Sequence, residues 1–323
     1  MRAITLPTFG GPEVLTLVDI PEPVVGPSDV LVAVAAAGVN HADLAQREGH
    51  YPPPVGAPDW PGMEVSGTVV RVGASVTRWA AGDRVCALIP GGGYAERAVV
   101  PEGLLLAVPD TIDLIDAAGL PEAACTVWAN VFMAAGLQSG QLLLVHGGSS
   151  GIGSTAIQLG VALGSTVFAT AGSATKVAFC DSLGARGINY REQDFAAIIA
   201  AETDDGVDVV LDIVGGDYLP RNVASLRMNG AIVIIANQSG TPGTFDINTL
   251  MRKRGTIRAT TLRARPLGER EAVVAAVQAN VMPLVASGAV KPMIDSVYPL
   301  ADAATAHRRM ESSEHLGKIL LAV

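Results

Sequence analysis

The feature that most constrains the fold is a glycine-rich turn between an apolar strand and a helix, in the segment LLLVHGGSSGIGSTAIQLGVALG at 142–164. Strand, tight turn and helix in this order form the pyrophosphate-binding element of dinucleotide-binding domains. The GxGxxG pattern falls on Gly148, Ser149, Ser150, Gly151, Ile152 and Gly153, with Ser150 in place of the middle glycine. The positive end of the helix starting near Gly151 would attract a phosphate group. We predict a nucleotide-binding loop; the alternative is a turn that binds nothing.

The surrounding sequence predicts a two-domain α/β protein. Between 123 and 261, short apolar strands alternate with helices of about ten residues, the pattern of a doubly wound parallel sheet. Residues 1–122 are β-rich, with short apolar runs separated by Gly, Pro and Asp. From 262 to 323 the chain has a helix expected over 268–287 and a final strand, GKILLAV. We therefore predict one domain at 123–261 and another from 1–122 with 262–323.

The end of the second predicted nucleotide-domain strand indicates which coenzyme binds. An NAD site usually has an acidic residue there, which binds the ribose 2′-hydroxyl. The segment TVFATAGSATK instead offers Gly172 and Ser173, and Lys176 follows. Without a carboxylate, and with a lysine nearby, a 2′-phosphate is favoured, so we predict NADPH. The alternative for Lys176 is a solvated helix residue.

Composition and charge limit the partners. A formal net charge of -9 argues against nucleic acid or an anionic membrane as the main partner. No apolar run approaches the ~18 residues needed to cross a bilayer, and the N-terminal segment lacks the apolar core of a signal peptide. Three widely separated cysteines indicate neither a disulfide framework nor a metal knuckle. We expect a cytoplasmic protein.

A second segment, VNHADLAQREGHY at 39–51, places His41, Asp43, Glu48 and His50 close together in sequence. These residue types can bind a metal ion. A catalytic zinc site requires three protein ligands around one open position, so the segment alone does not decide between a metal site and the wall of another pocket.

Several motifs in the same order resemble those of the zinc-free quinone oxidoreductases of the medium-chain dehydrogenase/reductase superfamily. They are NHADLAQREGHYPPP, LIPGGGYAE, VPEGLLLAVP, PEAACTVW, INYREQDF and TTLRARP. The resemblance covers essentially the whole chain and is greatest to the branch that a tumour suppressor induces in animals. It implies a Rossmann cofactor domain and a GroES-like catalytic domain completed by the C-terminal segment.

The resemblance also bears on the metal question. Zinc-dependent members have a ligating Cys where this chain has Asn40, and a Gly-His-Glu where it has PGMEVSG, with Met63 at the histidine position. Nothing like their Cys-rich structural-zinc lobe follows the glycines at 91–93. We therefore predict that no metal binds.

By resemblance, Asn40 lies beside the nicotinamide, Tyr51 faces the substrate and Asp43 shapes the loop between them. The alternatives are a turn asparagine, a tyrosine that shields Pro52–Pro54, and a helix N-cap at Asp43, which is the favoured role there. The resemblance further implies cofactor contacts from Thr126, Tyr190, Ile213, Val214, Asn237, Leu262, Arg263 and Lys318. For these the alternatives are core packing at Ile213 and Val214, a surface charge at Arg263 and a strand-edge lysine at Lys318.

The predicted reaction is metal-free, NADPH-dependent reduction of quinones or similar activated electrophiles. Hydride addition to a quinone or enone gives a delocalised anion, which needs less help from a Lewis acid than an alkoxide does. Tyr51 is the one local proton donor we can name, and solvent is an equal candidate. Two alternatives stay open, an enoyl or alkenal reductase and an NADPH-binding protein with little turnover. An exposed edge at the late strands of the nucleotide domain would offer pairing to another subunit, and the resemblance implies a homodimer formed in that way; a tetramer stays open.

Overall fold

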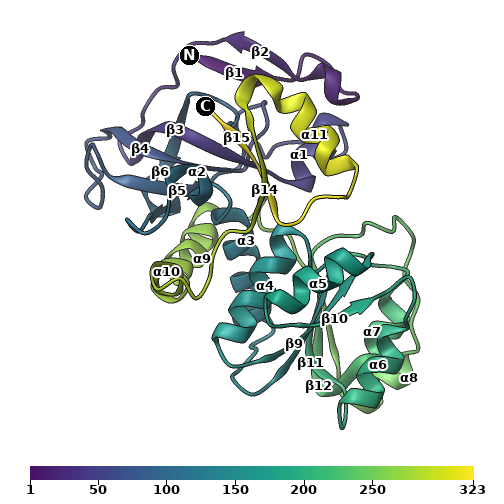
Figure 1. The fold of residues 1–323 in the computed structure, drawn as a ribbon. Helices are drawn as coiled ribbons and strands as arrows, with labels where there is room; N and C mark the ends of the chain where they lie inside the picture. Colours follow the sequence, from purple (N-terminus) through teal and green to yellow (C-terminus); the bar gives the residue numbers. More distant parts are fainter. The chain divides into compact units, whose positions relative to one another are not determined.

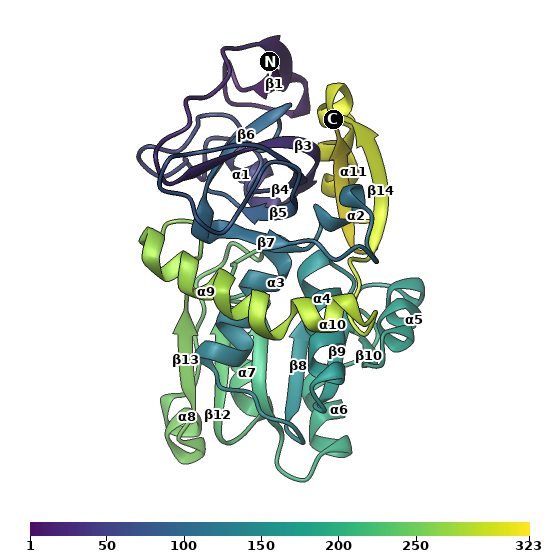
Figure 2. The same ribbon diagram turned by 90° about the vertical axis from the view of Figure 1, so that its left-hand side faces the viewer.

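A computed structural model describes residues 1–323. Its contacts divide the chain into two compact units, Met1–Cys125 with Leu262–Val323, and Thr126–Thr261. The predicted boundary after 122 and the observed boundary after Cys125 both fall within helix α3 (Pro121–Val127). Figures 1 and 2 show the elements of each unit.

The unit Thr126–Thr261 contains a six-stranded, all-parallel sheet in the order β10-β9-β8-β11-β12-β13. Because the first three strands in sequence run outward in one direction and the next three in the other, the order reverses between β8 and β11. Ligands bind at such a switch point in open parallel sheets. The predicted doubly wound sheet is confirmed. The strands are β8 (Leu142–His146), β9 (Thr166–Ala171), β10 (Arg186–Asn189), β11 (Val207–Asp212), β12 (Leu226–Ile234) and β13 (Thr256–Ala259).

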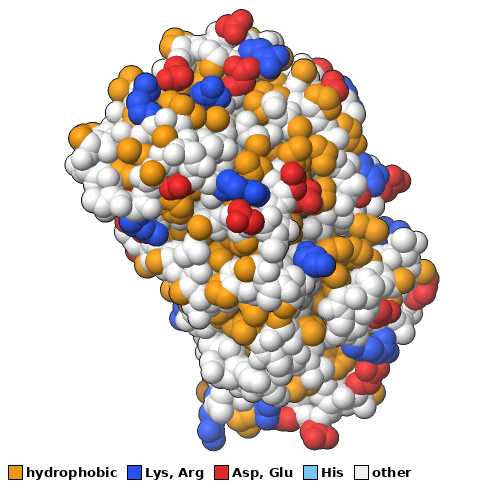
Figure 3. All heavy atoms as spheres, turned by 60° about the vertical axis from the view of Figure 1, so that its left-hand side comes forward, with side chains coloured by type: hydrophobic (Ala, Val, Ile, Leu, Met, Phe, Trp, Pro, Cys, Tyr) orange, Lys and Arg blue, Asp and Glu red, His pale blue; other side chains and the backbone are white.

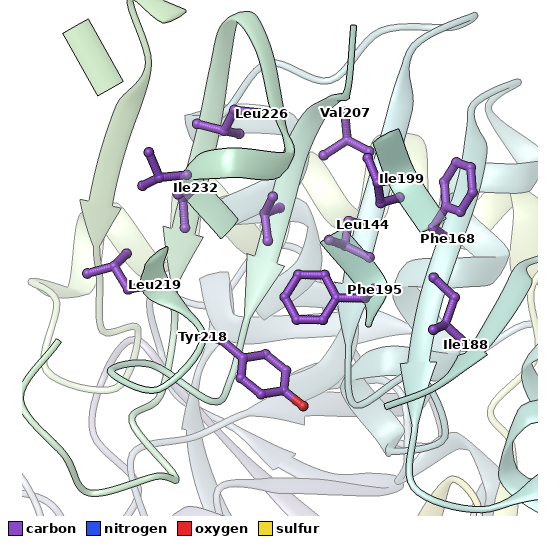
Figure 4. Packing of buried hydrophobic residues seen from close by; sticks show 12 residues of the cluster. Leu144, Phe168, Ile188, Phe195, Ile199, Val207, Tyr218, Leu219, Leu226 and Ile232 are labelled. Atoms are coloured by element: carbon purple, nitrogen blue, oxygen red, sulfur yellow. The ribbon is translucent and has the colours of Figure 1, made fainter. Parts of the chain in front are cut away.

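Helices between these strands bury apolar side chains against the sheet. Figure 4 shows Phe195 and Tyr218 beside strand residues such as Leu144. The two aromatic rings lie 5.1 Å apart between centroids, and burial of each large side chain stabilises the fold by roughly 1.5–3 kcal/mol. The helices are η3 (Trp128–Ala134), α4 (Gly151–Ala162), α5 (Ala174–Ser182), α6 (Phe195–Glu202), α7 (Leu219–Ser225) and α8 (Ile247–Lys253).

The other unit is built on a seven-stranded sheet in the order β14-β15-β3-β4-β5-β7, with β6 also paired to β3. The C-terminal strand β15 lies between β14, to which it is parallel, and β3, to which it is antiparallel, as Figure 1 shows. The chain's end therefore completes a sheet begun at its start. Its strands are β3 (Asp29–Val39), β4 (Glu64–Val72), β5 (Arg84–Leu88), β6 (Arg97–Pro101), β7 (Leu105–Ala107), β14 (Ile294–Pro299) and β15 (Lys318–Ala322). A separate two-stranded sheet pairs β1 (Arg2–Thr5) with β2 (Thr16–Asp19).

Helices of 3 to 14 residues lie between these strands in sequence. They are η1 (Pro12–Val14), α1 (His41–Arg47), η2 (Glu102–Leu104), α2 (Leu114–Ala117), α9 (Leu267–Asn280), α10 (Met282–Ala286), η4 (Leu300–Asp302) and α11 (Ala303–Glu311). The single helix predicted over 268–287 is wrong, because α9 ends at Asn280 and α10 begins at Met282. Pro283 explains the break, since proline has no N–H to continue the helix and its ring clashes with the carbonyl four residues earlier.

No helix in the chain combines the length and the apolar character needed to cross a membrane. On the face drawn in Figure 3, acidic and basic side chains are interspersed with hydrophobic ones. That face therefore offers no extended patch of a single charge.

Candidate functional site

The predicted phosphate loop connects β8 to α4, and its shape depends on Gly153. A Cβ atom at this position would lie 2.2 Å from the carbonyl oxygen of Gly147 and 2.6 Å from Cα of Gly148. Any side chain would therefore push the helix off the turn. Ser150 is the helix N-cap, and its Oγ accepts a hydrogen bond of 3.0 Å from the N–H of Gly153. The serine that replaces the middle glycine thus has a structural role that the sequence motif did not indicate.

The start of α4 fits a phosphate group. The N–H groups of Gly151 and Ile152 belong to the first turn, which has no earlier helical carbonyl to accept them. The helix dipole adds partial positive charge at the same end. Backbone groups of the loop could therefore hold a pyrophosphate without any basic side chain.

The carboxyl ends of β9 and β10 bring together four predicted cofactor residues. A Cβ atom on Gly172 would lie 2.7 Å from the Tyr190 hydroxyl oxygen, so the tyrosine packs directly over this glycine. Ser173 caps α5, and its Oγ accepts a 3.3 Å hydrogen bond from the N–H of Lys176. None of these four residues is acidic, and the set offers hydroxyl groups and an ammonium group to a phosphorylated ribose.

A buried polar chain at the switch point was missed by the sequence analysis. The Asn222 amide donates through Nδ2 to Asp212 Oδ2 at 3.0 Å, so its Oδ1 accepts from Nε2 of His146 at 2.7 Å. The other ring nitrogen of His146 accepts from the Thr170 hydroxyl at 3.0 Å. Burial lowers the pKa of His146 to about 4, so the ring is neutral. The only local signal was a polar residue at the end of each apolar strand.

Asp212 holds the loop that carries Ile213 and Val214. Its Oδ1 accepts hydrogen bonds from the N–H groups of Val214 and Gly215, at 2.7 and 3.1 Å. Both predicted cofactor residues are partly buried, and Val214 packs against the core. Asn237 lies three residues beyond the end of β12, and its Oδ1 accepts from the N–H of Gly216 at 3.1 Å. Their contacts with a cofactor stay predictions.

In the other unit, Asn40, Glu64 and Lys318 form a buried cluster. Lys318 Nζ donates to Glu64 Oε1 at 2.5 Å and to Asn40 Oδ1 at 2.6 Å. The suggestion of a strand-edge lysine is wrong, because β15 has a partner strand on each side. Glu64, the first residue of β4, was not singled out from the sequence, although it stands at the glutamate position of the Gly-His-Glu motif compared with PGMEVSG.

Asp43 lies at the third position of α1, and Asn40 is the N-cap. The expected N-cap role for Asp43 is therefore wrong, since its carboxylate reaches back to accept from the N–H of Asn40 at 2.9 Å. It also accepts from the N–H of Gly62 at 2.9 Å and from the Tyr94 hydroxyl at 3.3 Å. Its side chain is fully buried. Asp43 thus ties two loops together, and a catalytic role stays a prediction.

Arg263 is 8% exposed, so the suggestion of a surface charge is wrong. Its guanidinium donates to Gln46 Oε1 and to the carbonyl oxygen of Pro90, both at 2.6 Å. The same group lies 5.3 Å from the ring centroid of Tyr51. Burial raises the pKa of Tyr51, which keeps the phenol protonated at neutral pH. Tyr51 therefore retains a proton to donate.

A small cavity of about 20 Å³ lies within the same unit. It has room for one or two water molecules, and is too small for a quinone ring. Two guanidinium nitrogens of Arg270, Nε and Nη1, are buried without a protein partner, and water in the cavity could accept from them. The lining residues are Met63, Leu88, Ile89, Glu122, Leu262, Arg263 and Arg270.

The remaining predicted residues are also placed. Thr126 is 6% exposed on α3, and its carbonyl oxygen accepts from Asn130 Nδ2 at 2.8 Å. No group of three or more His, Cys, Asp or Glu side chains is arranged to hold a metal ion. Among the residues first considered as ligands, the His50 side chain is 77% exposed, and Glu48 pairs with Arg47. Metal independence stays a prediction.

Comparisons with known proteins extend over both units. A family model described as an alcohol dehydrogenase GroES-like domain matches residues 26–110, and one described as a zinc-binding dehydrogenase matches residues 183–321. A quinone oxidoreductase of Rattus norvegicus is 33% identical over 99% of this chain and 97% of its own length.

Two solved structures are similar over their full length. An NAD-dependent alcohol dehydrogenase superposes with a TM-score of 0.88 at 30% identity, covering 100% of each chain. The Escherichia coli quinone oxidoreductase complexed with NADPH superposes with a TM-score of 0.86 at 29% identity, again covering 100% of each.

The burial of Asp43 predicts a pH dependence of stability. Burial raises the pKa of this carboxyl group from 3.8 to about 6, although N–H donors from Gly62 and Asn40 oppose the shift. Because the folded-state pKa is the higher one, its contribution to stability is full below about pH 4 and is lost as the pH rises through 6. We expect the loss to be about 3 kcal/mol at pH 7.

Urea unfolding of wild type and Asp43→Asn at pH 4 to 7 measures this. The amide of Asn presents an NH2 group to backbone N–H donors, so the variant should have a lower free energy of unfolding than wild type at every pH. The difference between the two should shrink as the pH rises, because only wild type loses stability when Asp43 ionises. Asp246→Asn is the matched control, because the pKa of Asp246 is lowered, chiefly by a hydrogen bond from Thr249. The loss of unfolding free energy in this variant should therefore grow as the pH rises from 3 to 5. A deficit of Asp43→Asn that grows from pH 4 to 7 would contradict the assignment.

Proposed function

Because the chain belongs to the medium-chain dehydrogenase/reductase superfamily, we propose that it is a metal-free, NADPH-dependent oxidoreductase that reduces quinones or similar activated electrophiles. The observation that carries the proposal is the acid-free cradle of Gly172, Ser173, Lys176 and Tyr190 beside a formed pyrophosphate loop. Quinone oxidoreductases among the relatives support the substrate class.

The residues present fit NADPH. The first turn of α4 would hold the pyrophosphate, and Ser173, Lys176 and Tyr190 would hold the 2′-phosphate. By resemblance, Asn40 and Thr126 would contact the nicotinamide half. When bound, the cofactor supplies a hydride from its nicotinamide ring. The protein would then orient the acceptor and exclude water, and either Tyr51 or solvent would supply a proton.

The buried ammonium of Lys318 supports metal independence. It donates to Asn40 Oδ1 and Glu64 Oε1, two oxygens that could otherwise be offered to a cation. Met63, next to Glu64, supplies only a thioether. A divalent ion at this position would therefore face a resident positive charge and would have to displace it.

NADPH oxidation followed at 340 nm tests the proposed function. Purified protein would be offered an ortho-quinone, a para-quinone and an alkenal in parallel, each with and without a chelator. We expect quinone-dependent turnover that survives chelation. Turnover on the alkenal alone would instead identify a double-bond reductase, and loss of activity on chelation would contradict the metal-free proposal. Tight NADPH binding without turnover on any acceptor would indicate a binding protein.

Coenzyme preference tests Lys176. Its ammonium group can bind a 2′-phosphate that NADH lacks, and one hydrogen bond to a charged group is worth about ten- to a hundredfold in affinity. We expect Lys176→Ala to raise KM for NADPH by that factor and to leave KM for NADH unchanged. Lys291→Ala, in the other unit, should change neither value. An unaltered NADPH/NADH ratio in Lys176→Ala would show that this lysine does not select the coenzyme.

We also propose a homodimer that forms through the edge of the parallel sheet. β13 is the last strand of that sheet, and α8 carries the exposed side chains of Ile247 and Met251, 64% and 68% accessible. Unpaired edges with apolar neighbours favour strand pairing between copies. Sedimentation equilibrium should give a dimer for wild type and a monomer for Ile247→Glu/Met251→Glu. A monomeric wild type would contradict this assembly, whereas a tetramer would require a second interface. A cytoplasmic location stays a prediction.

A further inference from the structure

Three polar side chains from distant parts of the chain meet inside the unit that contains the termini. Asn40 follows β3, Glu64 begins β4 and Lys318 begins β15. They are 8%, 0% and 4% exposed, respectively. Each charge has therefore been taken out of water, which costs several kcal/mol per ion unless partners replace the lost hydration.

The partners form a closed set. The Lys318 ammonium donates to Glu64 Oε1 at 2.5 Å, to Asn40 Oδ1 at 2.6 Å and more weakly to the carbonyl oxygen of Val39 at 3.4 Å. Glu64 Oε1 also accepts from Asn40 Nδ2 at 2.9 Å. Its other oxygen accepts from the N–H of Glu122, in the first turn of α3, at 2.9 Å. Both carboxylate oxygens and all three ammonium hydrogens are thus used.

The surroundings are shaped to hold this cluster. A Cβ atom on Gly38 would lie 2.2 Å from Glu64 Oε1, so the strand residue beside the carboxylate must be glycine. Replacing a buried ion pair with apolar side chains of similar size is often neutral or stabilising. A contribution to stability alone therefore does not explain the buried Lys318–Glu64 pair. The other effect of this pair is on the third residue of the cluster, Asn40.

The cluster fixes the direction of the Asn40 amide. Nδ2 must face the carboxylate of Glu64, with Gly38 O at 3.5 Å from the same nitrogen, and Oδ1 must face the ammonium of Lys318. A flipped amide would point NH2 at an ammonium group and oxygen at a carboxylate. The capping box with Asp43 engages the same side chain, so the Asn40 amide has a single orientation.

We infer that Lys318 and Glu64 are positioning residues that hold the Asn40 amide in one orientation toward the nicotinamide half of the cofactor. The inference rests on the proposed function, since it takes NADPH as the ligand that Asn40 meets. Lys318 then acts through Asn40 and need not touch the cofactor itself.

The test replaces both charges together. Lys318→Met alone would leave a buried carboxylate unpaired and could prevent folding, so the informative variant is K318M/E64M, which puts an apolar pair in their place. We expect a melting temperature near that of wild type and NADPH binding weakened about tenfold, measured as Kd from the fluorescence of bound NADPH. Asn40→Ala in the wild-type background should also weaken NADPH binding about tenfold. In the K318M/E64M background it should weaken binding little further, because the effects of mutations within one hydrogen-bond network are not additive.

A matched control removes another ion pair that involves the C-terminal segment. Arg309 donates to both carboxylate oxygens of Asp295 at 3.0 Å, and neither residue is a predicted cofactor contact. R309M/D295M should change the melting temperature and leave the Kd for NADPH unaltered. The control thereby separates a general loss of the C-terminal strands from a specific loss of Asn40 orientation.

The outcomes are distinguishable. The positioning role would be overturned if K318M/E64M bound NADPH with the wild-type Kd. It would also be overturned if Asn40→Ala raised the Kd as much in that background as it does in wild type. Weakened and non-additive binding would support it, even if no quinone were reduced, because the Kd does not depend on turnover. Absence of turnover with intact binding would contradict only the proposed reaction, whereas a wild type that does not bind NADPH would contradict both.

Discussion

The nucleotide-binding unit depends on a backbone-to-backbone contact that only glycine allows. At Gly153 the nearest atom to a would-be Cβ is the carbonyl oxygen of Gly147, at 2.2 Å. Because no side chain intervenes, α4 starts directly against the turn after β8, and its first N–H groups face outward with the positive end of the helix. The place proposed for the pyrophosphate, at the start of α4, depends on that approach.

The other unit relies on buried polar groups that satisfy one another. Asp43 joins the start of α1 to the loop at Gly62, Arg263 joins Gln46 to Pro90, and Lys318 joins Asn40 to Glu64. If one of these polar groups lost its hydrogen-bond partners, the fold would be destabilised, because no water reaches the buried group to replace those partners. The unit is thus held in a single arrangement around the residues predicted to face the nicotinamide, which is what hydride transfer at a fixed distance requires.

Local patterns were enough to predict the parallel sheet, its phosphate loop and the acid-free end of β9, because each depends on residues close in sequence. The Lys318–Glu64 pair could not be predicted, since its members are 254 residues apart. Asp43 was taken for the N-cap because Asn40 and Asp43 are both capping residue types, and three positions apart they form one reciprocal motif. For Arg263 the alternative to a cofactor contact was a surface charge, because its partners Gln46, Tyr51 and Pro90 are far from it in sequence.

The central claim is that this chain transfers a hydride from NADPH to a conjugated acceptor. The most direct measurement is a single turnover, in which protein loaded with NADPH is mixed rapidly with an ortho-quinone and absorbance is followed at 340 nm. The experiment is repeated with NADPH deuterated at C4 on either face. The account predicts a primary isotope effect on the decay at 340 nm for one face only. Decay of NADPH that is insensitive to deuterium on both faces would contradict it.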